Sequence, residues 1–166
     1  MTPREVLEKT PFFAGAMSAA ELDRLAAKLQ VKPFPRGAVL VRQGEMGASM
    51  FIVVDGKVNV TVHLRAGEER VATLGPSDIV GEMSLLTGAR RSATVTATRA
   101  VSTLEIGKPA LEEFLVDSPQ LIGRFAEMVE QRRAEIDYIH DLDGRVDSVG
   151  LSRAEIAARM TAFYTG

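Results

Sequence analysis

The sequence predicts an α+β fold: a β-barrel or jelly roll of about eight short antiparallel strands, with helices before it and a long helix after it. Between Lys32 and Ile106, apolar and polar residues alternate with a period of two, which is typical of half-buried strands. Glycine-bearing turns separate these short segments, as in hairpins. On both sides of this zone the apolar residues recur at helical spacing. Many short strands at close spacing therefore favour a barrel or sandwich flanked by helices.

Length and composition restrict the class of protein. The chain has 166 residues, a formal net charge of −2 and no cysteine, which suits one globular domain and excludes a disulfide framework, thiolate catalysis and zinc-ribbon chemistry. The charge argues against a general nucleic-acid partner, because such binding depends on neutralising phosphates. No apolar run approaches the roughly 20 residues needed to cross a bilayer, and the N-terminus lacks the apolar region of a signal peptide. We therefore expect a cytoplasmic chain that does not itself insert into a membrane.

The first zone, residues 3–30, is expected to be helical. Ser18 and Glu21 have the spacing of a capping box at a helix start. Residues 10–15, which precede this helix, are expected to form an apolar turn. The residues that follow the cap make an apolar stripe at helical spacing, namely Leu22, Leu25, Ala26 and Leu29.

The second zone, residues 32–106, forms the predicted barrel. Its clearest strand alternates apolar and polar residues, with Val58, Val60, Val62 and Leu64 on the apolar side. Similar short strands are predicted at residues 38–42, 50–54, 69–74, 93–97 and 101–106. The turns between them carry Gly37, Gly44, Gly56 and Gly67.

The third zone is helical again, beginning with a short helix near residues 109–115. Ser118 and Pro119 make a good N-cap and first-turn pair, so a long helix is predicted from there to about Leu142, with Gly144 at its end. One face of this helix carries Leu121, Phe125, Met128, Arg132, Ile136 and Ile139. The domain itself is placed at residues 1–144, and residues 145–166 are predicted to be a short amphipathic tail.

One segment, residues 80–95, breaks the strand alternation. Gly81 and a one-turn helix predicted from Met83 to Leu86 interrupt the barrel there. The N-terminus of a helix offers unpaired N–H groups and a positive dipole end, which suit an anion. A nearby arginine supplies a forked donor set for phosphate oxygens, and Glu82 supplies an acceptor for a sugar hydroxyl. These groups together indicate a nucleotide site rather than a catalytic one.

The same segment closely resembles the phosphate-binding cassette of the cyclic-nucleotide-binding superfamily. That superfamily includes catabolite-activator-type regulators, regulatory subunits of cAMP-dependent kinase and nucleotide-gated channels. The cassette pattern is Gly-Glu, four small or apolar residues, a glycine turn and Arg-small-Ala-Thr-Val, and residues 81–95 fit it without a gap. Residues 34–58 are similar to the first half of the superfamily's barrel, and the likeness extends over about residues 6–138. The resemblance implies a jelly-roll domain with a cyclic nucleotide as its ligand and with no cofactor.

The resemblance also implies roles for individual residues. Glu82 would accept a hydrogen bond from the ribose 2′-hydroxyl, and Arg91 would pair with the cyclic phosphate. Members that prefer cGMP often carry threonine where Ser92 stands, so the serine favours cAMP, with cGMP as the alternative. Arg90 lies where the superfamily varies and is expected to be solvated. Other implied members are Gly81 at the turn, Ser84, Ser92 and Ala93 as donors to the phosphate, and Val60, Val71 and Met83 as walls of the pocket.

Arg132 is a lone arginine on the apolar face of the long helix. Such a residue needs a partner or an opening to water. In channel-type members of the superfamily an arginine at about this distance beyond the cassette caps the base, so the resemblance implies that Arg132 stacks on the purine from a lid helix. The alternative is that its side chain extends past the apolar face to solvent. In the lid role, ligand would shift an open–closed equilibrium of the helix.

The sequence leaves the output of this domain open. The first hypothesis is the cytosolic regulatory domain of a bacterial ion channel, with its effector domain outside this chain. The second is a stand-alone cAMP-binding protein, and the third is a truncated catabolite-activator-type regulator, since residues 152–160 look like the opening helix of a helix-turn-helix. Turnover of a cyclic phosphate would need a metal cluster or a positioned base, and the sequence offers neither. We therefore expect no enzyme and no metal site. His63 and His140 are both assigned to the surface.

Overall fold

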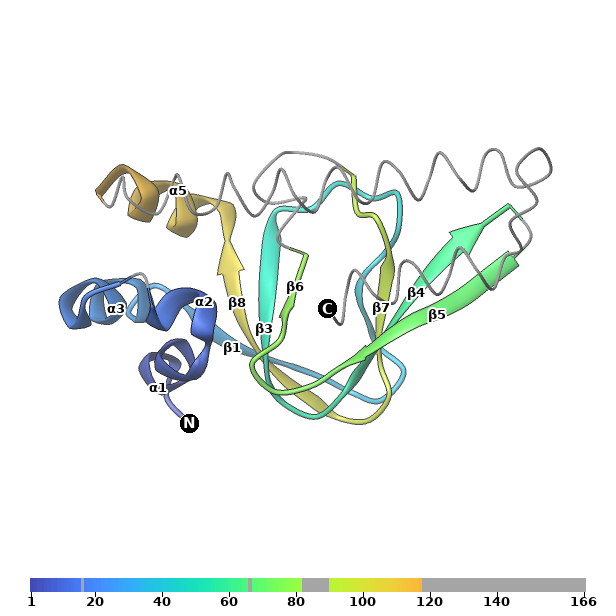
Figure 1. The fold of residues 1–166 in the computed structure, drawn as a ribbon, viewed down its shortest axis with the longest axis horizontal. Helices are drawn as coiled ribbons and strands as arrows, with labels where there is room; N and C mark the ends of the chain where they lie inside the picture. The colour runs from blue at the N-terminus through green and yellow to red at the C-terminus, as the bar shows by residue number, and fades with distance from the viewer. Residues whose placement is uncertain (16, 66, 82–89, 118–166) are drawn as a thin grey trace.

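The computed structural model describes residues 1–15, 17–65, 67–81 and 90–117, and Figure 1 shows helices on one side of two sheets. Three short helices come first: α1 (Pro3–Lys9), α2 (Pro11–Ala14) and α3 (Ala19–Ala26). At the start of α3 the Glu21 N–H donates to the Ser18 hydroxyl at 3.2 Å, and the Ser18 N–H donates to the Glu21 carboxylate at 3.0 Å. The predicted capping box is therefore confirmed.

Two details of this helical zone differ from the prediction. Residues 11–14 form one turn of helix rather than an apolar turn, since proline is well tolerated at the first helical position. The third helix ends at Ala26 rather than near residue 30. Beyond it the N–H groups of Lys28 and Leu29 donate to carbonyls three residues earlier, which tightens the chain into a turn before the first strand.

The described residues form eight strands in two antiparallel sheets of four. The order is β1-β8-β3-β6 in the first sheet and β2-β7-β4-β5 in the second, and every pairing is antiparallel. This arrangement confirms the predicted antiparallel jelly roll. The strands are β1 (Gln30–Phe34), β2 (Val39–Val41), β3 (Ser49–Asp55), β4 (Val58–Leu64), β5 (Gly67–Leu74), β6 (Ile79–Val80), β7 (Thr94–Ala97) and β8 (Val101–Gly107).

The sequence pattern predicts β2–β5, β7 and β8 but does not predict β1 or β6. β1 contains Pro33, is exposed along most of its length and pairs only with β8, as an edge strand does. It therefore lacks the alternating burial by which a strand is recognised. β6 has only two residues, too few to show any period. Both strands form because a neighbouring strand offers them hydrogen bonds.

Two hydrophobic cores share the strands β3 and β8. The barrel core fills the space between the two sheets, and the helical core lies between the first sheet and the helices. On β3, Phe51 and Val53 belong to the barrel core, whereas Met50 and Ile52 belong to the helical core, because successive side chains of a strand point to opposite faces. Further members of the barrel core include Val41, Val58, Val60, Val62, Val71, Val80, Ala93 and Val95, and those of the helical core include Leu7, Phe13, Leu25, Leu104, Ile106, Leu111 and Phe114.

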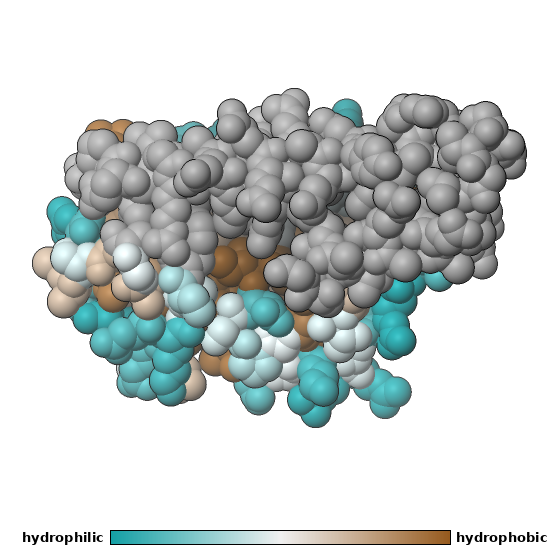
Figure 2. All heavy atoms as spheres, viewed as in Figure 1, coloured by the Kyte–Doolittle hydropathy of each residue, from teal (hydrophilic) through white to brown (hydrophobic). Residues whose placement is uncertain are grey.

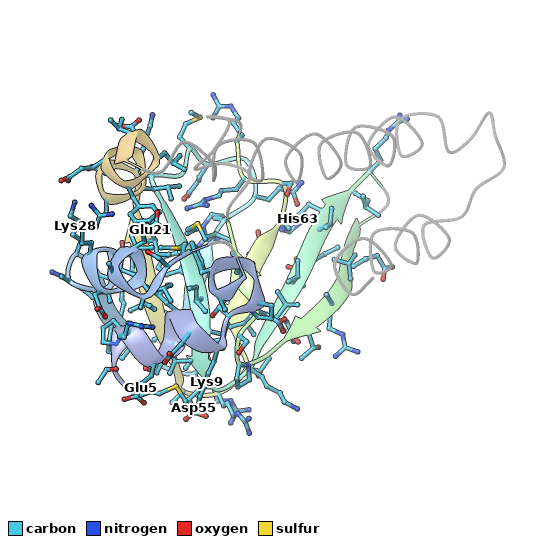
Figure 3. All side chains as sticks on the ribbon, turned by 60° about the vertical axis from the view of Figure 1, so that its left-hand side comes forward. Glu5, Lys9, Glu21, Lys28, Asp55 and His63 are labelled. Carbon is cyan, nitrogen blue, oxygen red and sulfur yellow. The ribbon has the colours of Figure 1, made fainter. Side chains whose placement is uncertain are left out.

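Helix α5 (Lys108–Asp117) begins directly after β8 and confirms the short helix predicted at this place. Its Leu111 and Phe114 side chains are buried in the helical core. Lys28, in the turn after α3, lies with its Nζ 2.6 Å from Oε1 of Glu113, and Figure 3 shows it projecting on this helical side of the molecule. Both apolar burial and an ion pair therefore connect α5 to the N-terminal helices.

On the face shown in Figure 2, apolar and hydrophilic residues gather in different places. Figure 2 shows apolar residues gathered near the centre of one face and hydrophilic residues along its lower edge. Among the helices of the described ranges, none is both long enough and apolar enough to cross a membrane. The predicted long helix to about Leu142 and the tail at residues 145–166 lie outside the described residues.

Candidate functional site

Three separate segments of the chain meet at Arg91. The 42–48 loop joins β2 to β3, Gly81 directly follows β6, and Arg91 stands shortly before β7. Residues 82–89, including the predicted one-turn helix, lie outside the described residues. The hydrogen bonds that join the three segments define one site at the end of the barrel where β3 and β7 begin and β6 ends.

The backbone of Arg91 is bonded to the 42–48 loop in both directions. Its N–H donates to the Glu45 carbonyl at 2.8 Å, and its carbonyl accepts from the Gly44 N–H at 2.9 Å. The left-handed backbone at Gly44, with φ of 86°, turns the loop so that this N–H faces Arg91. The loop therefore fixes the position from which the arginine side chain starts.

The side chain of Arg91 is half-buried and points inward. Its Nη1 donates to the Gly81 carbonyl at 2.8 Å, and its Nη2 donates to the Ser49 carbonyl at 2.8 Å. Beside it lies Gly47, where even a methyl group would overlap the guanidinium. The guanidinium is thus held between the beginning of β3 and the end of β6. Arg90, by contrast, is exposed and donates to the Gly44 carbonyl at 3.0 Å, as expected for a solvated arginine.

The guanidinium of Arg91 carries its charge in a partly dry environment. Burial lowers the pKa of Arg91 below its ordinary value, and the negative charge of Glu45 opposes this shift. The ordinary pKa of an arginine is so high that Arg91 remains charged at neutral pH. The Glu45 carboxylate itself lies 3.6 Å from Nε of Arg42. Within the described residues, Arg91 has carbonyl dipoles but no carboxylate at ion-pair distance, an arrangement that suits an external anion.

The side chain of Gln43 connects the 42–48 loop to the end of β4. The Gln43 amide donates to the His63 carbonyl at 3.2 Å and accepts from the His63 N–H at 2.8 Å, so it continues the ladder at the end of β4. The Gln43 N–H donates to the Thr94 hydroxyl at 3.0 Å. The His63 ring is exposed and lies 3.5 Å from Glu68, as predicted for a surface histidine, and Figure 3 shows it on the β4 side of the molecule.

The structure brings together part of the predicted site. Gly81 and Arg91 are in direct contact, and Gly81 has the left-handed backbone that its turn requires, with φ of 84°. Ser92, next to Arg91, is half-buried. The predicted wall residues Val60 and Val71 share the barrel core with Ala93, and all three are buried. Glu82, Met83, Ser84 and Arg132 lie outside the described residues, as does His140.

Sequence reasoning missed the side of the site that the 42–48 loop and Ser49 provide. Gly44, Glu45 and Ser49 contact Arg91 through backbone N–H and carbonyl groups, which almost every residue type carries. Their roles therefore cannot be recognised from their residue types. The contact of Ser49 with Arg91 also spans 42 positions of the chain. The only available signal was the close spacing of Gly44 and Gly47 between two predicted strands.

The region that contains this site is similar to a known protein family. Residues 31–118 match the family described as the cyclic nucleotide-binding domain. A CRP-like cAMP-activated global transcriptional regulator of Mycobacterium tuberculosis is 29% identical over 129 residues, which are 77% of this chain and 57% of the regulator. A cyclic nucleotide-gated potassium channel of Mesorhizobium japonicum is 33% identical over 129 residues, which are 78% of this chain and 34% of the channel. This chain therefore matches only part of each curated relative.

A solved structure gives the same result for the fold. The N-terminal domain of a transcriptional regulator from Streptomyces coelicolor superposes with a TM-score of 0.65 at 30% identity. The superposition covers 78% of this chain and 93% of that domain. The similarity therefore extends across nearly the whole of an independently determined domain.

Proposed function

Because the chain belongs to the cyclic nucleotide-binding domain family, we propose that it binds cAMP at Arg91 and acts as a sensor rather than an enzyme. The observation that carries this proposal is the half-buried guanidinium of Arg91, held by two carbonyls and, among the described residues, without a carboxylate partner. A buried charge is expensive unless it is paired. A bound phosphate would supply a negative charge that the described residues do not place at ion-pair distance.

The donor geometry of Arg91 fits a cyclic phosphate. A guanidinium has five N–H groups in one plane. Ser49 and Gly81 each accept from one of its two terminal nitrogens, so the described residues leave further donors on the same fork. Two parallel N–H donors match the two free oxygens of a phosphate. A cyclic phosphate carries one negative charge, which one arginine balances.

We assign the remaining ligand contacts by the family's pattern. Glu82 accepts from the ribose 2′-hydroxyl, and Arg132 stacks on the base from the C-terminal helix. The barrel-core positions of Val60, Val71 and Ala93 support their assignment to the inner side of the site. The full proposed set is Val60, Val71, Gly81, Glu82, Met83, Ser84, Arg91, Ser92, Ala93 and Arg132.

The choice of cAMP over cGMP has two supports. Ser92 stands where members that prefer cGMP often carry threonine. The Mycobacterium tuberculosis relative is described as cAMP-activated. We therefore propose cAMP as the ligand and keep cGMP as the second candidate. A cytoplasmic location agrees with either nucleotide.

The effector that receives the signal is proposed separately. We favour the regulatory domain of a bacterial ion channel, supported by the 33% identity to a potassium channel. A stand-alone cAMP-binding protein and a catabolite-activator-type regulator are the alternatives, the latter supported by the match to a transcriptional regulator. The sequence encoded next to this segment decides among them: apolar spans of about 20 residues support the channel, and a complete helix-turn-helix supports the regulator.

Calorimetric titration tests the binding proposal. The protein is titrated with cAMP, cGMP and cyclic di-GMP at one salt concentration, and the cAMP sample is then analysed for AMP. We expect saturable binding of cAMP, weaker binding of cGMP and no AMP. Absence of binding by all three nucleotides would refute the proposed ligand class, and steady production of AMP would refute the sensor assignment.

A further inference from the structure

Gly47 makes a close contact that the loop itself does not require. A Cβ placed on Gly47 would overlap the guanidinium of Arg91, and the three nearest atoms to it all belong to that group. The backbone of Gly47 is outside the left-handed region, so its conformation is one that other residues also adopt. The missing side chain, rather than the backbone angle, is therefore the property that this position uses.

The other glycines near the site show why Gly47 differs. Gly44 has a left-handed backbone but open space where its side chain would be. Gly81 has a left-handed backbone and would also overlap Arg91 through a Cβ. Substitution at either of these positions therefore strains the turn, and substitution at Gly81 also crowds the site. Among these three glycines, Gly47 is the one at which a substitution alters the space available to Arg91 without forcing a left-handed residue.

We propose that Gly47 is a positioning residue whose lack of a side chain allows Arg91 to lie against the Ser49 and Gly81 carbonyls and to present its remaining donors to the ligand phosphate. This inference rests on the proposed function, since it concerns the same anion site. The two carbonyl bonds, both 2.8 Å, fix the plane of the guanidinium. A bidentate contact with phosphate depends on that plane.

The structure also indicates which group would move if position 47 carried a larger residue. The overlapping atoms are the far end of a flexible side chain, so Arg91 can move while the backbone stays. A methyl group would push the guanidinium away from both carbonyls. Loss of one charge-assisted hydrogen bond to a ligand weakens its binding by about tenfold to a hundredfold. We therefore expect Gly47→Ala to fold normally and to bind cAMP about tenfold to a hundredfold more weakly.

A double-mutant cycle tests whether Gly47 acts through Arg91. The variants are Gly47→Ala, Arg91→Ala and the two combined, with cAMP affinity measured by calorimetry and folding checked by thermal melting. Gly75→Ala is the matched control, because Gly75 has no left-handed backbone and the nearest atom to its added Cβ is 3.9 Å away. We expect Gly75→Ala to bind like the wild type.

The expected result is non-additive. Once Arg91 is absent, Gly47→Ala should weaken binding no further, so the double variant should match Arg91→Ala within about twofold. Wild-type affinity in Gly47→Ala, or a double variant clearly weaker than Arg91→Ala, would overturn the positioning role and leave the cAMP site standing. Failure of the wild type to bind any cyclic nucleotide would overturn both proposals, which separates the two kinds of failure.

Discussion

Arg91 is oriented by backbone groups that come from two other segments of the chain. Glu45 and Gly44 hold its main chain, and Ser49 and Gly81 hold its side chain. A long side chain normally loses rotamer freedom when it binds a ligand. Arg91 has lost that freedom before any ligand arrives. The guanidinium is therefore already oriented for the anion that we propose as its ligand.

Replacement of Arg91 by alanine should remove the main anchor of the ligand. We expect the affinity for cAMP to fall by about 2–5 kcal/mol, which is roughly thirtyfold or more, as in the truncation of a buried charge partner. Arg90→Ala is the matched control, because Arg90 is the adjacent, exposed arginine. Calorimetric titration of both variants provides the measurement. A loss smaller than about threefold in Arg91→Ala would speak against the phosphate contact.

Ser77 is the one non-glycine residue with a positive φ in the described part of the chain, at 74°. It lies in the turn between β5 and β6, where its N–H donates to the Val53 carbonyl at 2.8 Å. Its hydroxyl makes a longer bond of 3.4 Å to the Lys9 carbonyl of α1. A residue with a Cβ is strained in this left-handed conformation. The turn therefore stores strain that glycine would not.

Ser77→Gly should stabilise the protein. Relief of left-handed strain is worth about 1–2 kcal/mol, and the extra chain entropy of glycine takes back about 0.5–1 kcal/mol. We expect a net gain of roughly 0.5–1 kcal/mol in the free energy of unfolding, measured by urea denaturation. Ser77→Ala keeps the strain and loses the hydroxyl, so it should be less stable than wild type. A less stable Ser77→Gly would mean that the bond to Lys9 outweighs the backbone strain.

At the scale of elements, the 42–48 loop and α5 are neighbours. The N–H of Lys108, the first residue of α5, donates to the Ala48 carbonyl at 2.9 Å, and Ser49 pairs with Gly107 at the end of β8. The segment that carries Ala48 and Ser49 therefore contacts both the Arg91 guanidinium and the beginning of α5. The middle of α5 is anchored by apolar burial, with Leu111 and Phe114 in the helical core.

The anchoring of α5 can be measured by truncating one side chain. Leu111 is 2% exposed, so Leu111→Ala should lower the free energy of unfolding by about 2–5 kcal/mol through lost burial and a residual cavity. Val116 on the same helix is 77% exposed, and Val116→Ala should change stability by no more than about 0.5 kcal/mol. Urea denaturation of both variants gives the comparison. Equal stabilities would show that α5 is not part of the cooperative core.

At the scale of the whole molecule, β3 and β8 join the barrel core to the helical core. Phe51 and Val53 face one core while Met50 and Ile52 face the other. The carbonyl of Ser49, at the beginning of β3, accepts a hydrogen bond from the Arg91 guanidinium. Occupation of the anion site should therefore stabilise the described domain as a unit rather than the barrel alone.

Thermal melting should show this linkage. A ligand that binds only the folded state stabilises it by about 2.7 kcal/mol at a hundred times its Kd, which for a chain of this size raises Tm by roughly 5–10 °C. We expect one transition that moves upward as cAMP is added. Arg91→Ala should show almost no shift at the same concentration. Two separate transitions, of which only one responds, would contradict a single cooperative unit.

The local sequence pattern was sufficient to predict most of the fold. The alternation from Val58 to Leu64 matches β4 residue for residue, and the capping box at Ser18 begins a helix where expected. Such features depend on spacing within a few residues. β1 and β6 were missed because an edge strand and a two-residue strand have no period of their own. They exist through pairing with strands far away in the sequence.

The sequence pattern alone predicted the jelly roll and the family to which the chain belongs, and it proposed Arg91 as the phosphate contact. The folded chain adds the described surroundings of the Arg91 guanidinium, which are the carbonyls of Ser49 and Gly81 and the side-chain-free position at Gly47. The physical reason is that residue type records side-chain chemistry and local periodicity. Backbone carbonyls and the absence of a side chain acquire their role from the folded path that brings distant segments together.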